Sequence, residues 1–345
     1  MLHRHHECCA GFGRGAFALP GTQRKYERSL PFEFRHVHLA LEVHPHEGLV
    51  TGSASWQFER RSQNATTLEL DAVGFQIDKL ELKSGKSWTP LEYEYDSESL
   101  SITIAPDCTA GELRITYKAR PKRGLYFLAP DEHYKKRPFQ VWSQCQDEDA
   151  RHWFPCHDKP HVKTTASFEI KVPDGLLVLC NGVLTKEQKD ARRNKHTFHY
   201  SMAQRMPSYL FTLVVGQFAR VQDRPARLQS GREIPIEYWV PKGKETDAKR
   251  GFDRTAEMIE LFSRLTGVEY PYERYTQIVV SDFIFGGMEN TSATTMYEHV
   301  LLDETAAIDI ESYDLVAHEL AHQWFGDWVT CKDWAHAWLN EGFAT

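Results

Sequence analysis

The sequence predicts a multidomain α+β protein in which a region of β-strands precedes a region of mixed helices and strands. The chain has 345 residues, enough for two domains. From about Leu30 to Phe218, apolar residues alternate with polar ones, a period of two that is typical of strands. After about Asp223, apolar residues also recur at helical spacing. We therefore expect a leader at 1–29, a β-domain at 30–222 and a second domain at 223–345.

The leader is expected to be flexible. It contains His3, His5, His6, Cys8 and Cys9, but no apolar segment of the kind found in a secretory signal. Histidine and cysteine are common metal ligands, but this stretch shows no regular ligand spacing. A flexible leader is therefore the better interpretation.

Composition and charge narrow the class of protein. Hydrophobic residues make up 41% of the chain and charged residues 26%, which is typical of a globular protein rather than a disordered one. The net charge of −7 gives no reason to expect nucleic acid as a partner. No apolar run is long enough to cross a membrane, so no membrane partner is expected. The seven cysteines include no Cys-x-x-Cys pair, which argues against a disulfide framework and predicts a cytoplasmic location.

Short strands separated by turn-forming residues are expected in the first domain. Alternating patterns predict strands at 37–43, 50–58, 102–104 and 113–117. Further strands are expected at 166–172, 176–180, 196–201 and 209–218. Because no long helix lies between them, they indicate a β-sandwich or a curved sheet.

The second domain shows a different pattern. Phe252, Ala256, Ile259 and Phe262 share one helical face, which predicts a helix within 246–267. Strands are expected at 277–280 and 294–302. A helix is expected at 309–325, followed by Gly326 as its stop signal, and another helix should begin near Asp333.

A metal-binding pattern lies in the helix expected at 309–325. On a helix, His318 and His322 lie one turn apart on the same face, close enough for both imidazoles to bind one tetrahedral ion. Glu319 lies at the edge of that face, where its carboxylate can act as a general base on water. A His-Glu-x-x-His string also arises by chance in a chain with 17 histidines. The pattern therefore needs a third ligand to support a metal site.

Glu341 is the candidate for that third ligand. It follows His322 after 18 intervening residues, an interval that fits a turn and the start of a helix folding back. By itself Glu341 would be interpreted as a solvated acid on a helix surface. Beside the histidine pair, it instead predicts one Zn²⁺ per chain, bound by His318, His322 and Glu341.

The charge distribution offers further support, with an alternative. Residues 281–345 contain twelve acidic residues and one basic residue, Lys332. Such a segment favours cations, for example a metal ion or a positively charged substrate end. Alternatively, further sequence supplies the balancing positive charges.

These motifs resemble one known family. His-Glu-Leu-Ala-His-Gln-Trp-Phe-Gly at 318–326 and Trp-Leu-Asn-Glu-Gly-Phe-Ala at 338–344 closely resemble the gluzincin aminopeptidases, the aminopeptidase N family. A second hallmark, Gly-Gly-Met-Glu-Asn, stands upstream at 286–290. The resemblance covers about 31–345. It implies a sandwich- or saddle-like β-domain, then the first part of a thermolysin-like zinc metallopeptidase domain that is incomplete at its C-terminus.

The Gly-Gly-Met-Glu-Asn motif has a clear physical sense. Paired glycines, Gly286 and Gly287, let the backbone approach a substrate closely, and Met288 completes the segment. Glu289 offers a carboxylate to a free α-ammonium group. Alone, the motif would be interpreted as a glycine turn followed by a surface acid. Beside the zinc motif it favours exopeptidase over endopeptidase action.

The resemblance also implies a role for two glutamines. Gln144 and Gln146 precede Asp149-Ala150-Arg151 and match the segment through which the family's β-domain contributes to the pocket for the substrate's N-terminus. By composition alone they would be loop residues. The similar segment Pro207-Ser208-Tyr209-Leu210 is interpreted as structural.

The resemblance therefore implies hydrolysis of the N-terminal residue from peptides that have a free N-terminus, with Glu319 as general base. A family branch with epoxide-hydrolase activity shares these motifs, and a non-catalytic scaffold is a further alternative. The family's oxyanion-stabilising tyrosine lies downstream of the last ligand, and no residue up to Thr345 matches it. We therefore expect these 345 residues alone to be a poor enzyme.

Overall fold

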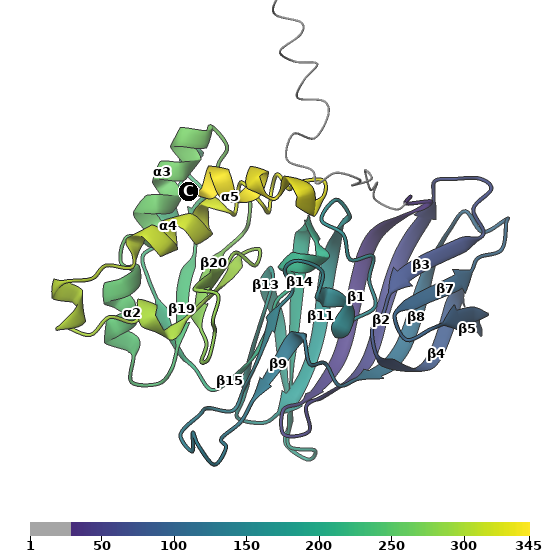
Figure 1. Cartoon of the computed structure of the whole chain (residues 1–345), viewed down its shortest axis with the longest axis horizontal. Helices are drawn as coiled ribbons and strands as arrows, with labels where there is room; N and C mark the ends of the chain where they lie inside the picture. Colours follow the sequence, from purple (N-terminus) through teal and green to yellow (C-terminus); the bar gives the residue numbers. More distant parts are fainter. Residues whose placement is uncertain (1–28) are drawn as a thin grey trace, which may run out of the picture. The chain divides into compact units, whose positions relative to one another are not determined.

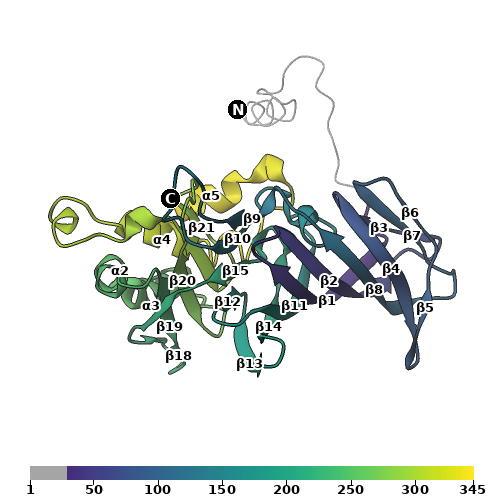
Figure 2. The same ribbon diagram turned by 90° about the horizontal axis from the view of Figure 1, so that it is seen from below.

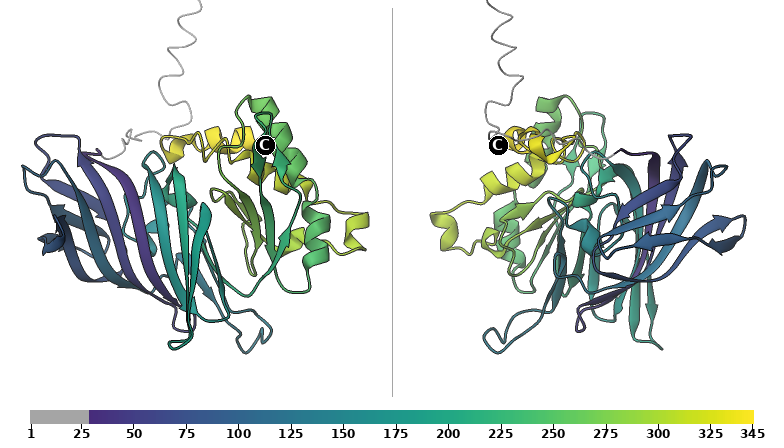
Figure 3. Two further views of the ribbon diagram at one scale, coloured as in Figure 1. Left: turned by 180° about the vertical axis from the view of Figure 1, so that it is seen from behind. Right: turned by 45° about the vertical axis from the view of Figure 1, so that its right-hand side comes forward.

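The first region of the computed structural model, which describes residues 29–345, is built on an eight-stranded sheet (Figure 1). Its order is β13-β14-β11-β1-β2-β8-β4-β5, and β1 and β11 are parallel neighbours. Its strands are β1 (Phe32–His44), β2 (Leu49–Arg60), β4 (Phe75–Ser84), β5 (Ser87–Pro90), β8 (Ala110–Ala119), β11 (Lys163–Pro173), β13 (Val183–Asp190) and β14 (Lys195–Pro207). Figure 3 shows this sheet from behind.

Two smaller sheets complete the first region. One has the order β12-β15-β10-β9 and the other the order β3-β7-β6. Their strands are β3 (Thr67–Asp71), β6 (Tyr93–Tyr95), β7 (Ser99–Thr103), β9 (Gly124–Leu128), β10 (Gln140–Gln144), β12 (Leu177–Cys180) and β15 (Leu213–Gly216). Alternate side chains of β1 and β11 are buried, as their period of two predicts. The β-rich character predicted for this region is confirmed.

The second region combines a five-stranded sheet with helices. The sheet has the order β16-β19-β20-β22-β21. Its strands are β16 (Ala219–Gln222), β19 (Ile236–Val240), β20 (Tyr275–Val279), β21 (Gly287–Met288) and β22 (Ala293–Met296), and a short hairpin, β17 (Ala226–Arg227) and β18 (Glu233–Ile234), lies between β16 and β19 along the chain. The helices α2 (Glu245–Phe252), α3 (Thr255–Thr266), α4 (Tyr313–Ala321) and α5 (Trp338–Ala344) gather around this sheet (Figures 1 and 2).

The prediction of a single helix within 246–267 is wrong, because the chain forms two helices, α2 and α3, with a break between them. In a continuous helix the carbonyl of Phe252 would accept from the N–H of Ala256. Here it accepts from the hydroxyl of Thr255 at 2.8 Å. The hydroxyl of Tyr238 also lies 2.9 Å from this carbonyl, but it is closer to the carboxylate of Asp223. A side-chain hydroxyl thus binds the Phe252 carbonyl at the point where the two helices are separated.

The helix predicted at 309–325 is shorter than expected. Asp303 accepts the backbone N–H groups of Thr305 and Ala306, so the preceding segment forms a short 3₁₀ turn of its own. Helix α4 therefore begins at Tyr313 and ends at Ala321. Two expected strands are also shorter than predicted. The strand expected at 209–218 is reduced to β15, which a 3₁₀ turn precedes. The strand expected at 294–302 is reduced to β22, which a 3₁₀ turn follows.

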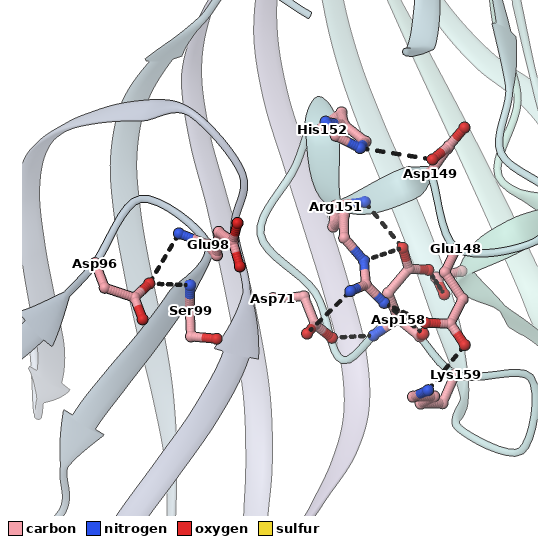
Figure 4. Close-up of polar contacts among 11 residues, drawn as sticks. Asp71, Asp96, Glu98, Ser99, Glu148, Asp149, Arg151, His152, Asp158 and Lys159 are labelled. Carbon is pink, nitrogen blue, oxygen red and sulfur yellow. Dashed lines mark hydrogen bonds and ion pairs between the residues drawn. The ribbon is translucent and has the colours of Figure 1, made fainter. Parts of the chain in front are cut away.

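A cluster of charged side chains fixes the segment that follows β10 (Figure 4). The guanidinium of Arg151 lies among the carboxylates of Asp71, Glu148 and Asp158, at 3.6, 2.6 and 3.2 Å. Burial raises the pKa of Asp158 to about 6 although Arg151 opposes this shift. Ser208 donates to Asp158 at 2.6 Å. The segment after β10 and the turn before β15 are therefore held together.

The structure tests the predicted division of the chain only in part. Residues Pro31–Thr345 form one unit, and the predicted leader, apart from residue 29, lies outside the described residues. The boundary between residues 222 and 223 stays a prediction. Within 29–345, no helix combines the length and apolar character needed to cross a membrane. The described cysteines are all free thiols: Cys108, Cys145, Cys156, Cys180 and Cys331.

Candidate metal centre

Helices α4 and α5 bring the three predicted metal ligands together. His318 lies on α4, and His322 lies one turn later, directly after the last residue of the helix. Their Nε2 atoms are 3.1 Å apart. Glu341 on α5 places Oε2 3.5 Å from Nε2 of His318 and 3.3 Å from Nε2 of His322. Among the residues that the structure describes, these three form the one cluster of potential metal-ligating side chains.

The separations between these atoms suit a tetrahedral ion. Ligand atoms about 2.0–2.2 Å from a zinc ion lie about 3.3–3.6 Å apart when the angles are tetrahedral. The three observed distances of 3.1, 3.3 and 3.5 Å are close to that range. Two imidazoles and one carboxylate are also a donor set of catalytic zinc sites, where a fourth position is left for a substrate or water. The residues present therefore fit zinc.

The orientation of His322 supports the same interpretation. Its Nδ1 lies 2.9 Å from the carbonyl oxygen of Phe325, so Nδ1 carries a proton and donates it. Nε2 is then the ring nitrogen that faces His318 and Glu341 and remains for a metal ion. A backbone carbonyl commonly fixes the tautomer of a metal-binding histidine in this way.

The electrostatics of the site favour a cation. Burial opposes protonation of His322, but the nearby carboxylates of Glu289, Glu341 and Glu319 outweigh it and raise its pKa to about 10. Hydrogen bonds from His318 and His322 lower the pKa of Glu341 well below its usual range. Burial raises the pKa of Asp327, another carboxyl beside the site. Carboxylates thus outnumber the fixed positive groups around the histidines.

Contacts of Asn340, the residue before Glu341, connect α5 to the loop before it and to Tyr209. Asn340 accepts from the backbone N–H of Cys331 at 3.0 Å and donates to the hydroxyl of Tyr209 at 3.3 Å. Tyr209 in turn donates to the carbonyl of Gly326 at 3.2 Å. Because Tyr209 belongs to the turn before β15, the first region of the chain helps to place Glu341.

Glu319 lies against the backbone of β21. It is buried on α4, and a Cβ atom added to Gly287 would lie only 2.1 Å from its Oε1 and 2.5 Å from its Cγ. Only glycine permits this approach. Burial, together with the charge of Glu289, raises the pKa of Glu319 well above its usual value. No described residue hydrogen-bonds its Oε2 atom, so this oxygen is available to a ligand.

Glu289 directly follows β21 and is also buried, with 3% of its surface exposed. Burial raises the pKa of its carboxyl group. Within 29–345, its Oε1 atom has no hydrogen-bond partner. The chain enters this segment through Gly286, whose φ of 81° favours glycine, and Met288 is buried beside it.

The two predicted glutamines lie at and after the end of β10. Gln144 is the last residue of the strand, rather than a loop residue as composition alone suggests, and is 4% exposed. Its Oε1 atom lacks a hydrogen-bond partner in the described chain. Gln146 lies two residues later and is partly exposed.

Strand β10 also contacts the loop that leads to Gly286. Trp142 donates to the carbonyl of Ser281 at 3.1 Å, and its ring packs edge-on against Phe283 at 5.3 Å. Gln140 accepts from the backbone N–H of Ser281 at 2.9 Å. The strand that carries Gln144 therefore lies beside the loop that leads to Glu289.

Sequence reasoning missed three residues that support this site: Gln323, Asn340 and Tyr209. Gln323 and Asn340 directly follow or precede predicted ligands, and this adjacency was an available signal. Tyr209 was interpreted as structural, and its contact with Asn340 spans 131 residues, which no local pattern reveals.

The chain matches two family models. Residues 25–210 match the Peptidase M1 N-terminal domain, and residues 250–345 match the Peptidase family M1 domain.

Curated relatives and solved structures agree with these matches. Over 64% of its own length, the chain is 35% identical to Aminopeptidase M1 of Arabidopsis thaliana. Over 80% of its own length, it is 33% identical to Probable aminopeptidase 2 of Sulfurisphaera tokodaii. It spans only 25% and 34% of the length of these two relatives. A mutant M1 zinc metallopeptidase from Deinococcus radiodurans, bound to the substrate Tyr-Ser-Ala, has a TM-score of 0.74 at 23% identity. That alignment covers 91% of this chain and 69% of the other.

Proposed function

Because this chain belongs to the peptidase M1 family, we propose that it carries the metal-binding and substrate-anchoring residues of a zinc aminopeptidase. The reaction is hydrolysis of the N-terminal residue from peptides with a free amino end. One observation carries this proposal: the triad of His318, His322 and Glu341 lies beside two further buried carboxyl groups, Glu319 and Glu289.

His318, His322 and Glu341 would hold one zinc ion per chain. When bound, the ion polarises a carbonyl group and lowers the pKa of water, which makes hydrolysis possible near neutral pH. Glu319 takes a proton from the attacking water and passes it to the leaving amine. Its buried position beside the metal ligands suits that exchange, and burial raises its pKa, which makes the carboxylate a stronger base.

Glu289 binds the α-ammonium group of the substrate. A buried carboxylate without a hydrogen-bond partner for one oxygen is costly, and an ammonium group supplies both a charge and donors. Gln144 adds a neutral acceptor, since its Oε1 is also buried and unpaired in the described residues. Gln146 is proposed to assist from the segment that follows. An N-acetylated peptide offers no positive charge to this pocket.

Relatives support the substrate class. The curated relatives described above are named aminopeptidases, and the Deinococcus radiodurans protein was solved with the peptide Tyr-Ser-Ala. Peptides are therefore the proposed substrates. The reducing, cytoplasmic location and the absence of nucleic-acid or membrane partners stay predictions.

Binding of two matched hydroxamates tests this function without requiring turnover. L-leucine hydroxamate offers a metal-binding group and a free ammonium, whereas N-acetyl-L-leucine hydroxamate offers only the first. We expect the zinc-loaded chain to bind the free amine roughly tenfold or more tightly, since a charge-assisted contact contributes about 1.5–3 kcal/mol. Glu289→Ala should remove this preference and leave the zinc content at one per chain.

Glu304→Ala is the matched control. Glu304 lies in the same acidic part of the chain, but its side chain is 90% exposed, so the variant changes the net charge equally without touching the pocket. It should bind both hydroxamates like the original chain. Failure to bind zinc, or equal affinity of the original chain for the two ligands, would show that the proposed function is wrong.

A further inference from the structure

We propose that Gln323 is a positioning residue, which fixes the anchor segment, Glu289–Ser292, relative to the metal centre. It thereby sets the distance from that centre at which a substrate ammonium group binds. This inference rests on the proposed function and adds a positioning residue to the site.

The amide group of Gln323 holds both ends of the anchor segment. Its Nε2 donates to the carbonyl of Glu289 at 2.9 Å, and its Oε1 accepts from the backbone N–H of Ser292 at 2.8 Å. The hydroxyl of Tyr270 lies 3.3 Å from Oε1 and 3.1 Å from the carbonyl of Arg274, and its one proton is shared between these two acceptors. Because a carbonyl only accepts and a backbone N–H only donates, these contacts fix the orientation of the amide.

Gln323 is also tied directly to the metal centre. It is the residue after His322, and its backbone N–H donates to the carbonyl of Leu320 at 3.0 Å. Its side chain is fully buried, so its rotamer is restricted by packing. A shift of the anchor segment relative to His322 would therefore break hydrogen bonds inside the protein, where unpaired polar groups are costly.

The first region of the chain holds the anchor segment from a second direction. Asn181, which follows β12, donates to the carbonyl of Thr291 at 2.9 Å. The backbone N–H of Gly182 donates to the hydroxyl of Ser292 at 2.9 Å. Ser292 has a φ of 63°, which is unfavourable for a residue with a side chain. These contacts hold it in that conformation, while Gln323 connects the segment to the end of α4.

This arrangement determines which ligands depend on Gln323. A ligand that reaches both Glu289 and the metal centre requires a fixed distance between them. A ligand that reaches only the metal centre does not. Loss of the amide leaves the carbonyl of Glu289 without this donor and frees the anchor segment to shift. Only the first kind of ligand should then bind more weakly.

Gln323→Met tests the inference, because methionine has a similar length and shape but makes neither hydrogen bond. The zinc-loaded variant should bind L-leucine hydroxamate roughly tenfold more weakly, the effect of losing a well-placed contact to a charged group. Its affinity for N-acetyl-L-leucine hydroxamate and for zinc should stay unchanged. Both ligands are measured by calorimetry, and folding is checked by thermal unfolding.

Gln277→Met is the matched control. Gln277 is also fully buried, and it donates to Thr255 at 2.9 Å, away from the anchor segment. This variant should keep the preference for the free amine. If Gln323→Met does not fold, Gln323→Glu is measured in the same way, since it keeps an acceptor for Ser292 and loses the donor to Glu289.

Each outcome is informative. An unchanged preference in the Gln323 variant, or equal weakening of both ligands, would overturn the positioning role while the proposed function stands. If the original chain shows no preference for the free amine, the proposed function fails first, and this inference fails with it.

Discussion

Replacing Tyr209 by phenylalanine removes one hydroxyl group between the first region of the chain and the helix that carries Glu341. The ring of Tyr209 packs edge-on against Trp334 at 5.0 Å, and phenylalanine preserves this contact. The hydroxyl, however, accepts from Asn340 and donates to the carbonyl of Gly326. The substitution therefore isolates two hydrogen bonds from the packing around them.

The size of the effect follows from these contacts. The carbonyl of Gly326 keeps the hydroxyl of Thr330 as a donor, but Asn340, which is only 1% exposed, loses its partner for Nδ2. An orphaned buried donor costs about 1–3 kcal/mol. The lost bond of 3.3 Å is long, so we expect the lower end, about 1 kcal/mol. Because Asn340 precedes Glu341, this cost appears as a zinc dissociation constant roughly fivefold higher.

Competition against a fluorescent zinc chelator measures this change in the 345-residue chain. Tyr117→Phe is the control, because Tyr117 is also fully buried and donates to the carbonyl of Trp153 at 2.8 Å, away from the helices. It should lower the stability of the chain but leave zinc affinity unchanged. Equal zinc affinity of the Tyr209 variant and the original chain would refute a role of Tyr209 in placing Glu341.

Two further predictions concern Glu319. Glu319→Gln should keep the zinc content but abolish hydrolysis of an L-leucine reporter amide, because the general base is lost. We expect this hydrolysis to be slow in the original 345 residues. Activity of the variant near the original rate would contradict the mechanism. Gly287→Ala should keep zinc but lower hydrolysis at least roughly tenfold, because the new methyl group displaces the Glu319 carboxylate. Gly342→Ala is the control, because its added Cβ meets no atom within 4 Å. Equal hydrolysis by the two glycine variants would show that the close approach at Gly287 has no role.

The candidate site follows from the sequence wherever its residues are close in the chain. His318 and His322 are four residues apart, and helical geometry alone places them on one face. Glu341 needed one further assumption, that the intervening residues fold back. The family resemblance added Glu289, whose carboxyl group lies near enough to His322 to shift its pKa.

The remaining features depend on contacts that no local pattern reveals. The break between α2 and α3 lies where the carbonyl of Phe252 contacts Thr255 and also Tyr238, a residue of a separate strand. Tyr209 and Asn340 are separated by 131 residues. The role inferred for Gln323 requires knowing that the backbone of Glu289 and Ser292 lies beside the end of α4. The fold class was therefore predictable, whereas the supporting hydrogen bonds were not.

The contact between Asn181 and the anchor segment bears on the order in which the parts of the protein fold. Asn181 and Thr291 are 110 residues apart, so their pairing requires closure of a long loop, which is a slow step in folding. During synthesis, however, the N-terminal part of a chain generally folds first. The strands around Asn181 then form a surface that is complete before His318 leaves the ribosome. The anchor segment can pack on that surface as it emerges, so the helix that carries His318 meets a partner that is already in place.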